Sequence, residues 1–221
     1  MKKVSESTVA RLSMYLRLLT ELQAEGVATL ASEELARRCG TSAAQVRKDL
    51  SAFGTFGKRG RGYAVAELAT ELRKILGLSR RWRVALVGAG KIGAALLAYQ
   101  DFRTQGFDIV AVFDRAEAKV GRVWNGLMVQ ADADMDATLR KGIDIAIVAV
   151  PAEAAQAVVD RIVASGVRAI LNFAPTKLAV PAHVTVKTVN MALELEGLSY
   201  ALVNDARGGR TVNTRPAASR G

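Results

Sequence analysis

Three glycines between residues 88 and 93 carry the clearest chemical pattern in the chain. They have the spacing G-x-G-x-x-G, directly after the apolar run at 82–87 and before a stretch with helical periodicity. In such a turn the first glycine permits a tight bend, the second lets the backbone approach a pyrophosphate, and the third lets helix and strand pack closely. We therefore expect a dinucleotide phosphate site formed by Gly88, Ala89, Gly90, Lys91, Ile92 and Gly93.

Asp114 supplies the second half of that pattern. It ends the apolar run at 107–114 and lies 21 residues after Gly93, where a carboxylate accepts hydrogen bonds from the adenosine ribose. A carboxylate also repels a 2′-phosphate, which favours NAD(H) over NADP(H), although Arg115 leaves NADP(H) open. The alternative is a glycine-rich turn that binds another nucleotide or none.

The helix predicted at 42–53 has the residue types of a DNA-reading helix. Val46, Leu50 and Phe53 share one face and should point inward, whereas small and basic residues point outward. A shorter helix predicted at 32–40 precedes it, and the pair is typical of a helix-turn-helix. The side chains expected to contact bases or phosphates are those of Gln45, Arg47 and Lys48.

The segment that follows, residues 54–63, contains four glycines and three basic residues. Glycines at this density permit turns with unusual φ, so we expect a hairpin that forms a wing. A wing can place arginine at a phosphate or in a narrow minor groove. Its predicted DNA contacts are Lys58, Arg59 and Arg61. The alternative is a solvated basic face on a helical bundle.

Positive charge is concentrated in the first part of the chain. Residues 1–83 hold sixteen Lys and Arg against eight Asp and Glu, whereas residues 84–204 hold eleven against twelve. The tail 205–221 holds four against one. A basic head on a neutral body indicates binding to a polyanion, and a solubilising surface is the alternative.

The sequence offers little for catalysis or metal binding. His183 is its only histidine and Cys39 its only cysteine, so we expect neither a metal site nor a disulfide framework. Arg103 follows Tyr99 by four residues where a short-chain dehydrogenase would have lysine. We expect no catalytic residue, no membrane-spanning segment and a reducing, cytoplasmic setting. A role for Cys39 stays undetermined.

The elements that must position these residues fall into two groups. The first group contains amphipathic helices at 5–25, 32–40, 42–53 and 65–77, with caps at Ser5 or Ser7 and a capping box from Ser42 to Gln45. The second group contains strands at 82–87, 107–114, 143–151, 167–175 and 184–189, and a strand-and-turn region around Val123 and Val129. Its helices are predicted at 91–104, near 132–141, at 152–165 and from 191 to about 203.

Continuous β-branched runs, without strict alternation, indicate strands buried on both faces of a parallel sheet. We predict an α/β protein whose second part is a doubly wound domain. The predicted parts are a DNA-binding domain at 1–80, a dinucleotide-binding domain at 81–189, a C-terminal helix at 190–203 and a disordered basic tail at 204–221.

Five segments together resemble the Rex family of NADH-sensing transcriptional repressors of bacteria. They are RLSMYLR (11–17), QVRKDLSAFGTFGKRGRGY (45–63), VGAGKIG (87–93), VAVPAEAAQ (148–156) and ILNFAPTKL (170–178). The resemblance covers nearly all of residues 4–203. It implies a homodimer whose subunits each have a winged-helix domain, a Rossmann-type NAD(H)-binding domain and a domain-swapped C-terminal helix. It also implies binding to pseudo-palindromic double-stranded operator DNA of respiratory and fermentative genes, with release when NADH rises.

The resemblance assigns further residues. Arg17 and Tyr99 match residues that exchange partners between the two states, and the partner in the family is an aspartate at the position of Asn190. An amide cannot form an ion pair with Arg17, so this latch is expected to be weaker or replaced. Pro151 and Met191 are the remaining residues expected at the cofactor.

The expected response depends on the charge of the nicotinamide ring. The ring of NADH is neutral and that of NAD⁺ is cationic, so an apolar pocket closed by the helix at 190–203 of the partner would favour the reduced form. Two other functions stay open: a small NAD-dependent reductase with a basic accessory domain, and a nucleotide-independent DNA-binding protein.

Overall fold

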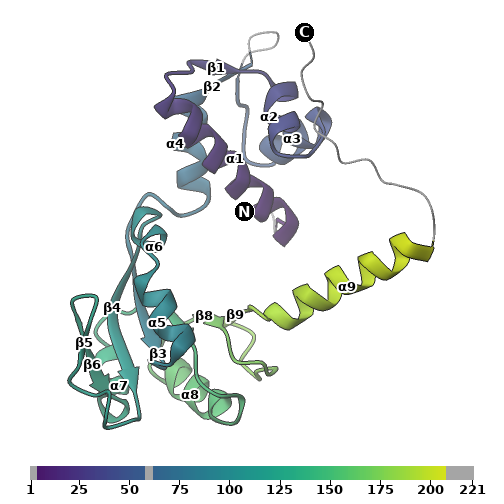
Figure 1. Ribbon diagram of the computed structural model, residues 1–221. Helices are drawn as coiled ribbons and strands as arrows, with labels where there is room; N and C mark the ends of the chain where they lie inside the picture. Colours follow the sequence, from purple (N-terminus) through teal and green to yellow (C-terminus); the bar gives the residue numbers. More distant parts are fainter. Residues whose placement is uncertain (1–3, 58–61, 208–221) are drawn as a thin grey trace. The chain divides into compact units, whose positions relative to one another are not determined.

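The computed structural model describes residues 4–57 and 62–207, and the chain folds as two units (Figure 1). The first unit contains Met1–Arg81 and Thr104–Gly106, and the second contains Trp82–Arg103 and Phe107–Gly221. The predicted wing contacts Lys58, Arg59 and Arg61 lie outside the described residues, as does the tail from residue 208.

The first unit is a helical domain with one short β-ladder. Its elements are α1 (Glu6–Ala24), β1 (Thr29–Leu30), α2 (Ser32–Arg38), α3 (Ala43–Ser51), β2 (Tyr63–Ala64) and α4 (Val65–Ile75). Strands β1 and β2 pair antiparallel. The four predicted helices are confirmed, and each end lies within two residues of its predicted position.

Side-chain caps mark where two of these helices, α1 and α3, begin. The Ser5 hydroxyl accepts a hydrogen bond from the Thr8 N–H at 3.2 Å, and Ser42 accepts one from the Gln45 N–H at 3.1 Å. Each bond satisfies a backbone donor that the first helical turn leaves free. The capping box predicted at Ser42 is only half correct, because the Gln45 side chain donates to Asp49 instead.

Leucines of α1 form the centre of the first core. Leu12, Leu19 and Tyr15 expose no surface, and Val46 and Leu50 of α3 are also buried. Burial of one such leucine contributes about 1.5–3 kcal/mol relative to leaving it exposed. The predicted inward face of α3 is therefore confirmed for Val46 and Leu50, while Phe53 is partly buried.

The second unit is built on a seven-stranded sheet. Its strands are β3 (Trp82–Val87), β4 (Phe107–Asp114), β5 (Val123–Trp124), β6 (Leu127–Ala131), β7 (Ile145–Val148), β8 (Ala169–Asn172) and β9 (Thr185–Thr188). The strand order is β5-β6-β4-β3-β7-β8-β9, and only the β5–β6 pair is antiparallel. The chain enters at central β3 and extends the sheet in both directions, so the predicted doubly wound fold is confirmed.

The helices of the second part of the chain connect these strands. They are α5 (Lys91–Ala98), α6 (Asp101–Thr104), the 3₁₀ turn η1 (Asp132–Asp134), α7 (Met135–Leu139), α8 (Ala152–Ala164) and α9 (Met191–Arg207). The polar helix predicted near 132–141 is thus a 3₁₀ turn followed by a short α-helix.

The single helix predicted at 91–104 is wrong. Tyr99 has extended backbone with ψ 98°, which interrupts the helical hydrogen bonds, and a new turn begins at Asp101. The Tyr99 hydroxyl donates to the Asp101 carboxylate at 2.9 Å, and the rings of Tyr99 and Phe102 meet edge to face with centroids 5.0 Å apart. These local contacts stabilise the break.

Helix α9 continues to Arg207, past the end predicted near Val203. The residues after Val203 include no glycine or proline before Gly208, so nothing in the sequence stops the helix earlier. Its large apolar side chains are exposed, namely Met191, Leu193, Leu195, Leu198, Tyr200, Leu202 and Val203. Among the described residues, no helix combines the length and the apolar character needed to cross a bilayer.

Candidate functional site

The glycine turn joins β3 to α5 by close backbone packing. Gly88 has φ +102°, and a Cβ atom there would overlap the carbonyl oxygen of Ala149. A Cβ at Gly93 would overlap the carbonyl oxygen of Gly88, whereas a Cβ at Gly90 would meet only open space. The first and third glycines are therefore required by packing, and the second leaves room beside the start of α5.

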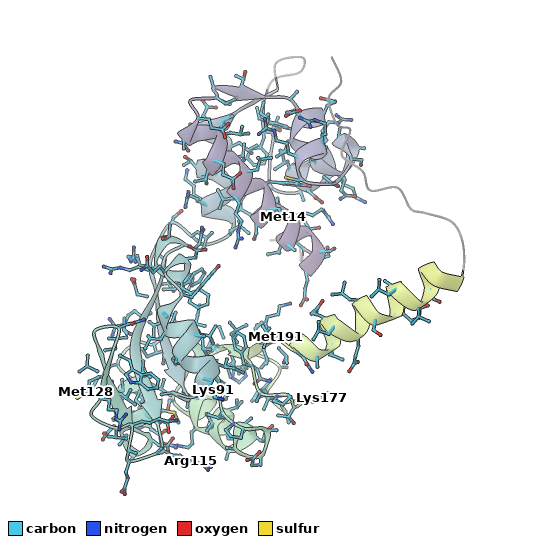
Figure 2. The ribbon with its side chains drawn as sticks, viewed as in Figure 1. Met14, Lys91, Arg115, Met128, Lys177 and Met191 are labelled. Atoms are coloured by element: carbon cyan, nitrogen blue, oxygen red, sulfur yellow. The ribbon has the colours of Figure 1, made fainter. Side chains whose placement is uncertain are left out.

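A pocket of about 560 Å³ opens at the carboxyl ends of β3, β4 and β7. This is the edge at which doubly wound sheets bind ligands. Four predicted cofactor residues line it: Gly88, Gly90, Asp114 and Pro151. The other predicted residues of the turn, Ala89, Lys91, Ile92 and Gly93, are not in its lining. Met191, 61% exposed at the start of α9 (Figure 2), is not in the lining either.

The Asp114 carboxylate accepts three hydrogen bonds in the pocket. Its donors are the backbone N–H groups of Ala89 and Ala116, each at 2.8 Å, and the Lys119 ammonium at 2.9 Å. Burial acts to raise the pKa of Asp114, but the bonds from Ala116, Lys119 and Ala89 outweigh it and hold the pKa below its ordinary value. An ionised acceptor therefore lies where ribose hydroxyls are expected.

Two cations of the pocket were not found from the sequence. Lys119 pairs with Asp114, and Arg161 of α8 pairs with Asp132 at 2.6 Å and Asp136 at 3.0 Å. Burial acts to lower the pKa of Arg161, but the Asp132 and Asp136 carboxylates together outweigh it and the pKa is raised. A lysine five residues after the strand-ending acid is visible in the sequence, but only the fold shows that the two side chains pair.

The predicted DNA contacts on α3 have three different environments. Lys48 is exposed. The Arg47 guanidinium donates to the Glu33 carboxylate at 3.1 Å, which holds it over the start of α2. The Gln45 amide is half-buried and donates to Asp49 at 2.7 Å. The structure therefore places Lys48 most freely toward solvent.

The three predicted switch residues are divided between the two units, with Arg17 in the first and Tyr99 and Asn190 in the second. Arg17 is an exposed residue of α1 in the first unit. Tyr99 is 51% exposed in the second unit, where the Asn190 side chain accepts a hydrogen bond from the Ala192 N–H at 3.0 Å. Asn190 thus caps the first turn of α9.

Cys39 lies half-buried in the first unit. Burial raises the pKa of its thiol, and the nearby Glu21 carboxylate adds to the effect. The thiol form is therefore favoured at neutral pH, as in an unreactive core cysteine. In the part of the chain that the structure describes, no three His, Cys, Asp or Glu side chains form a group that could hold a metal ion.

Curated relatives match almost the whole chain. A redox-sensing transcriptional repressor Rex from Roseiflexus sp. (strain RS-1) is 44% identical over 211 residues, which cover 95% of this chain and 96% of the relative. One from Carboxydothermus hydrogenoformans is 45% identical over 204 residues, covering 92% and 98%. The chain belongs to the Rex family of redox-sensing transcriptional repressors.

Solved structures of the Rex-family repressor RSP have the same fold. RSP in complex with β-NAD⁺ and operator DNA is 35% identical, has a TM-score of 0.89 and is matched over 93% of this chain and 95% of that chain. RSP in complex with β-NADH is 34% identical, with a TM-score of 0.83 and coverage of 93% and 97%. The fold of this Rex chain is therefore found with both forms of the coenzyme.

Two family models match separate parts of this Rex chain. The model described as a putative DNA-binding protein N-terminus matches residues 3–51, which contain α1, α2 and α3. The model described as a CoA binding domain matches residues 79–176, which contain the glycine turn and strands β3 to β8. The first match covers the helix-turn-helix pair and the second covers the pocket.

Proposed function

We propose that this Rex chain represses transcription by binding operator DNA through its first unit, and that it leaves the DNA when NADH occupies its second unit. The observation that carries the proposal is that one chain combines a glycine-turn pocket ending in an ionised Asp114 with a helix pair that exposes Lys48. The ligands of RSP, operator DNA with β-NAD⁺ in one crystal and β-NADH in another, support it.

The residues of the pocket suit NAD(H). Gly90 leaves open space beside the start of α5, where N–H groups and the helix dipole favour a pyrophosphate. Asp114 offers an acceptor for the adenosine ribose and repels a 2′-phosphate. Pro151 lines the pocket beside β7. Lys91, at the first residue of α5, adds positive charge near the phosphates.

Coenzyme A is a second candidate ligand, because the model that matches residues 79–176 is described as a CoA binding domain. NAD(H) and CoA share an adenosine diphosphate group, so the glycine turn suits both. The adenosine of CoA carries a 3′-phosphate, and the Asp114 carboxylate would repel that charge at close range. This repulsion favours NAD(H).

The proposed discrimination between NADH and NAD⁺ follows from the charge of the nicotinamide ring. In the proposed homodimer, α9 of one subunit covers the nicotinamide of the other and places Met191 beside it. Transfer of a cation into such an apolar environment is unfavourable, so NADH stabilises the closed arrangement more than NAD⁺ does. Arg17 and Tyr99 exchange partners between the two states, and the neutral Asn190 makes a hydrogen-bonding contact in place of an ion pair.

We infer that the chain catalyses no reaction. A hydride-transferring enzyme needs a positioned proton donor or acceptor near the substrate, whereas the two carboxylates of the pocket, Asp114 and Asp132, are held in ion pairs with Lys119 and Arg161. The curated relatives are named as transcriptional repressors. We place its action in the cytoplasm, because bacterial operators are there.

The decisive experiment is a titration of operator binding against each nucleotide. Fluorescence anisotropy with a labelled operator duplex should show affinity falling at least tenfold when NADH is added, and much less with NAD⁺ or CoA. A complete switch from 1:99 to 99:1 needs about 5.5 kcal/mol of differential binding. Equal responses to NADH and NAD⁺ would contradict the sensor, and a stronger response to CoA would favour the second ligand.

A matched variant tests whether the pocket carries the response. In Gly90→Arg the new Cβ meets open space, so the fold should persist while the long side chain occupies the pyrophosphate position. Operator affinity without nucleotide should be unchanged, and the NADH effect should be lost. If the NADH effect persists in this variant, NADH acts at another site.

A further inference from the structure

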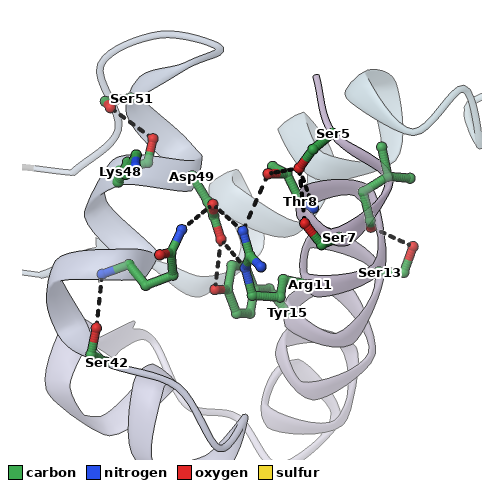
Figure 3. A network of polar contacts seen from close by, with 12 residues as sticks. Ser5, Ser7, Thr8, Arg11, Ser13, Tyr15, Ser42, Lys48, Asp49 and Ser51 are labelled. Atoms are coloured by element: carbon green, nitrogen blue, oxygen red, sulfur yellow. Dashed lines mark hydrogen bonds and ion pairs between the residues drawn. The ribbon is translucent and has the colours of Figure 1, made fainter. Parts of the chain in front are cut away.

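The carboxylate of Asp49 is the only buried acidic side chain among the described residues of the chain. It lies on α3, and its side chain is 2% exposed. Arg11 of α1 donates to both of its oxygens, at 2.6 and 2.8 Å, and the Tyr15 hydroxyl donates at 3.1 Å (Figure 3). Gln45, one turn earlier on α3, donates at 2.7 Å. Four donors from two helices therefore converge on one acceptor-only group.

The hydrogen bonds of this network determine the protonation of Asp49 and Tyr15. Burial acts to raise the pKa of Asp49, but the hydrogen bonds from Arg11, Gln45 and Tyr15 outweigh it and the pKa is lowered. The reverse effect is seen at Tyr15, where burial and the bond to Asp49 raise the pKa to about 12. The network is therefore an ionised carboxylate with neutral tyrosine over the neutral pH range.

A buried ion pair is not an efficient way to stabilise a small domain, because well-packed apolar residues often do as well or better. The ion pair differs from apolar contacts in that its strength depends on the relative orientation of the two groups. Val46 and Leu50 attach α3 to the core through contacts that tolerate small rotations of the helix, since apolar burial is non-directional. The planar fork of Arg11 pairs with two oxygens at once and so permits a narrow range of angles.

The same carboxylate also fixes the amide of Gln45. A glutamine side chain can present either its NH₂ group or its carbonyl in a given direction. Because Asp49 is ionised and can only accept, it holds the NH₂ group of Gln45 and determines where the carbonyl faces. Lys48 and Ser51 lie outside this network (Figure 3) and remain on the exposed part of α3.

We propose that Asp49 is a positioning residue for sequence recognition: with Arg11 and Tyr15 it sets the rotation of α3 and the orientation of Gln45, and thereby the preference for operator over other DNA. This inference rests on the proposed function, in which α3 enters the major groove. Base contacts depend on the angle of the helix, whereas phosphate contacts by flexible lysine and arginine depend mainly on charge. Loss of the network should therefore reduce discrimination more than general affinity for DNA.

The test compares Asp49→Asn with the control Glu71→Gln. Both replace a carboxylate by an amide and raise the net charge by one, but the Glu71 side chain on α4 is 45% exposed and pairs with Lys74, three residues along the same helix, at 2.7 Å. Asparagine has one accepting end for four donors, so the network cannot be rebuilt. Dissociation constants are measured for an operator selected by the unaltered protein from a random duplex pool, and for a scrambled duplex, at several salt concentrations.

We expect the ratio of the two dissociation constants to fall at least tenfold in Asp49→Asn, while the affinity for the scrambled duplex and its salt dependence stay within twofold. Glu71→Gln should keep the ratio of the unaltered protein. A folded Asp49→Asn with an unchanged ratio, or with both affinities reduced in parallel, overturns the proposal. A selection that yields no preferred sequence for the unaltered protein refutes the proposed function instead.

Arg11→Lys covers the case in which Asp49→Asn does not fold. It keeps both charges and loses the two-pronged contact, so the domain should fold while the ratio falls at least threefold. Circular dichroism and the melting temperature establish that each variant is folded at the temperature of the assay. A folded Arg11→Lys with the full ratio also overturns the proposal.

Discussion

The three glycines of the nucleotide turn are required for different reasons. Gly88 combines a positive φ with contact to the Ala149 carbonyl, and Gly93 touches the Gly88 carbonyl through backbone alone. Gly90 has ordinary negative φ and open space around it. Packing within the protein therefore requires glycine at the first and third positions. At the second position, only a bound ligand would require it.

This difference predicts the effect of two alanine substitutions. Gly93→Ala should lower the free energy of unfolding of the second unit by about 1–3 kcal/mol, the usual effect of forcing a methyl group into a packed site. Gly90→Ala should stay within about 0.5 kcal/mol of the unaltered protein. Urea unfolding followed by the signal of the second unit measures both.

NADH binding separates the two substitutions further. Gly93→Ala should weaken NADH binding through displacement of the turn, and Gly90→Ala should weaken it only if the nucleotide approaches the backbone there. If the two substitutions have equal effects on unfolding, the close packing of α5 on β3 is not as described.

At the scale of residues, the sequence predicted those site residues that belong to a motif with fixed spacing. The glycines and Asp114 were found because their spacing along the chain reflects one local strand-turn-helix unit. Lys119 and Arg161 were missed, because their roles depend on partners that only the fold brings near. Asp49 is the one acid among residues 37–61, which hold seven Lys and Arg, but the sequence did not show that it pairs with Arg11, 38 residues away.

At the scale of elements, helix α9 has an unusual surface. Seven of its large apolar side chains are exposed, between 48 and 74%, far more than a helix in contact with water normally shows. Leu195 and Leu198 lie near its middle. In the proposed homodimer these side chains are covered by the partner subunit.

We therefore predict that Leu195→Glu combined with Leu198→Glu disrupts the homodimer. Burial of two leucines contributes about 1.5–3 kcal/mol each, and charged replacements would oppose docking. Sedimentation velocity should show a dimer for the unaltered protein and monomer for the double variant at micromolar concentration. Glu194→Gln with Glu196→Gln is the control on the same helix and should remain dimeric. An unchanged dimer in the double variant would show that α9 is not the interface.

Helix and strand positions followed well from periodicity and from glycine and serine boundaries. The strands at 82–87 and 107–114 were predicted to the residue, since each is a continuous apolar run with clear ends. The break at Tyr99 was not predicted, because the apolar periodicity continues through it and the contacts of Tyr99 with Asp101 and Phe102 stabilise it locally.

At the scale of the whole molecule, positive charge is concentrated in the first part of the chain. Residues 1–83 have eight more basic than acidic residues, and residues 84–204 have one fewer. Such a distribution makes DNA affinity depend on salt through the counterions that bound cations release. We therefore expect salt to weaken the binding of DNA by the first unit more than the binding of nucleotide by the second.

Lys48→Ala should weaken operator binding and reduce the slope of log affinity against log salt concentration by about 1, the value for one lost phosphate contact. Lys177→Ala, an exposed lysine of the second unit (Figure 2), is the control with the same change in charge and should leave the slope unchanged. Anisotropy titrations at four salt concentrations measure both slopes. If Lys48→Ala binds DNA like the unaltered protein throughout that range, α3 is not the recognition helix.

The bonds to Asp114 have a consequence for the ligand-free protein. The carboxylate already accepts hydrogen bonds from a lysine and two backbone amides, so the charge of Asp114 is satisfied without a nucleotide. Arrival of a nucleotide would exchange one set of hydrogen bonds for another and would not rescue an unstable site. We therefore expect the second unit to be folded before the coenzyme binds, so that the response to NADH depends on binding and not on folding.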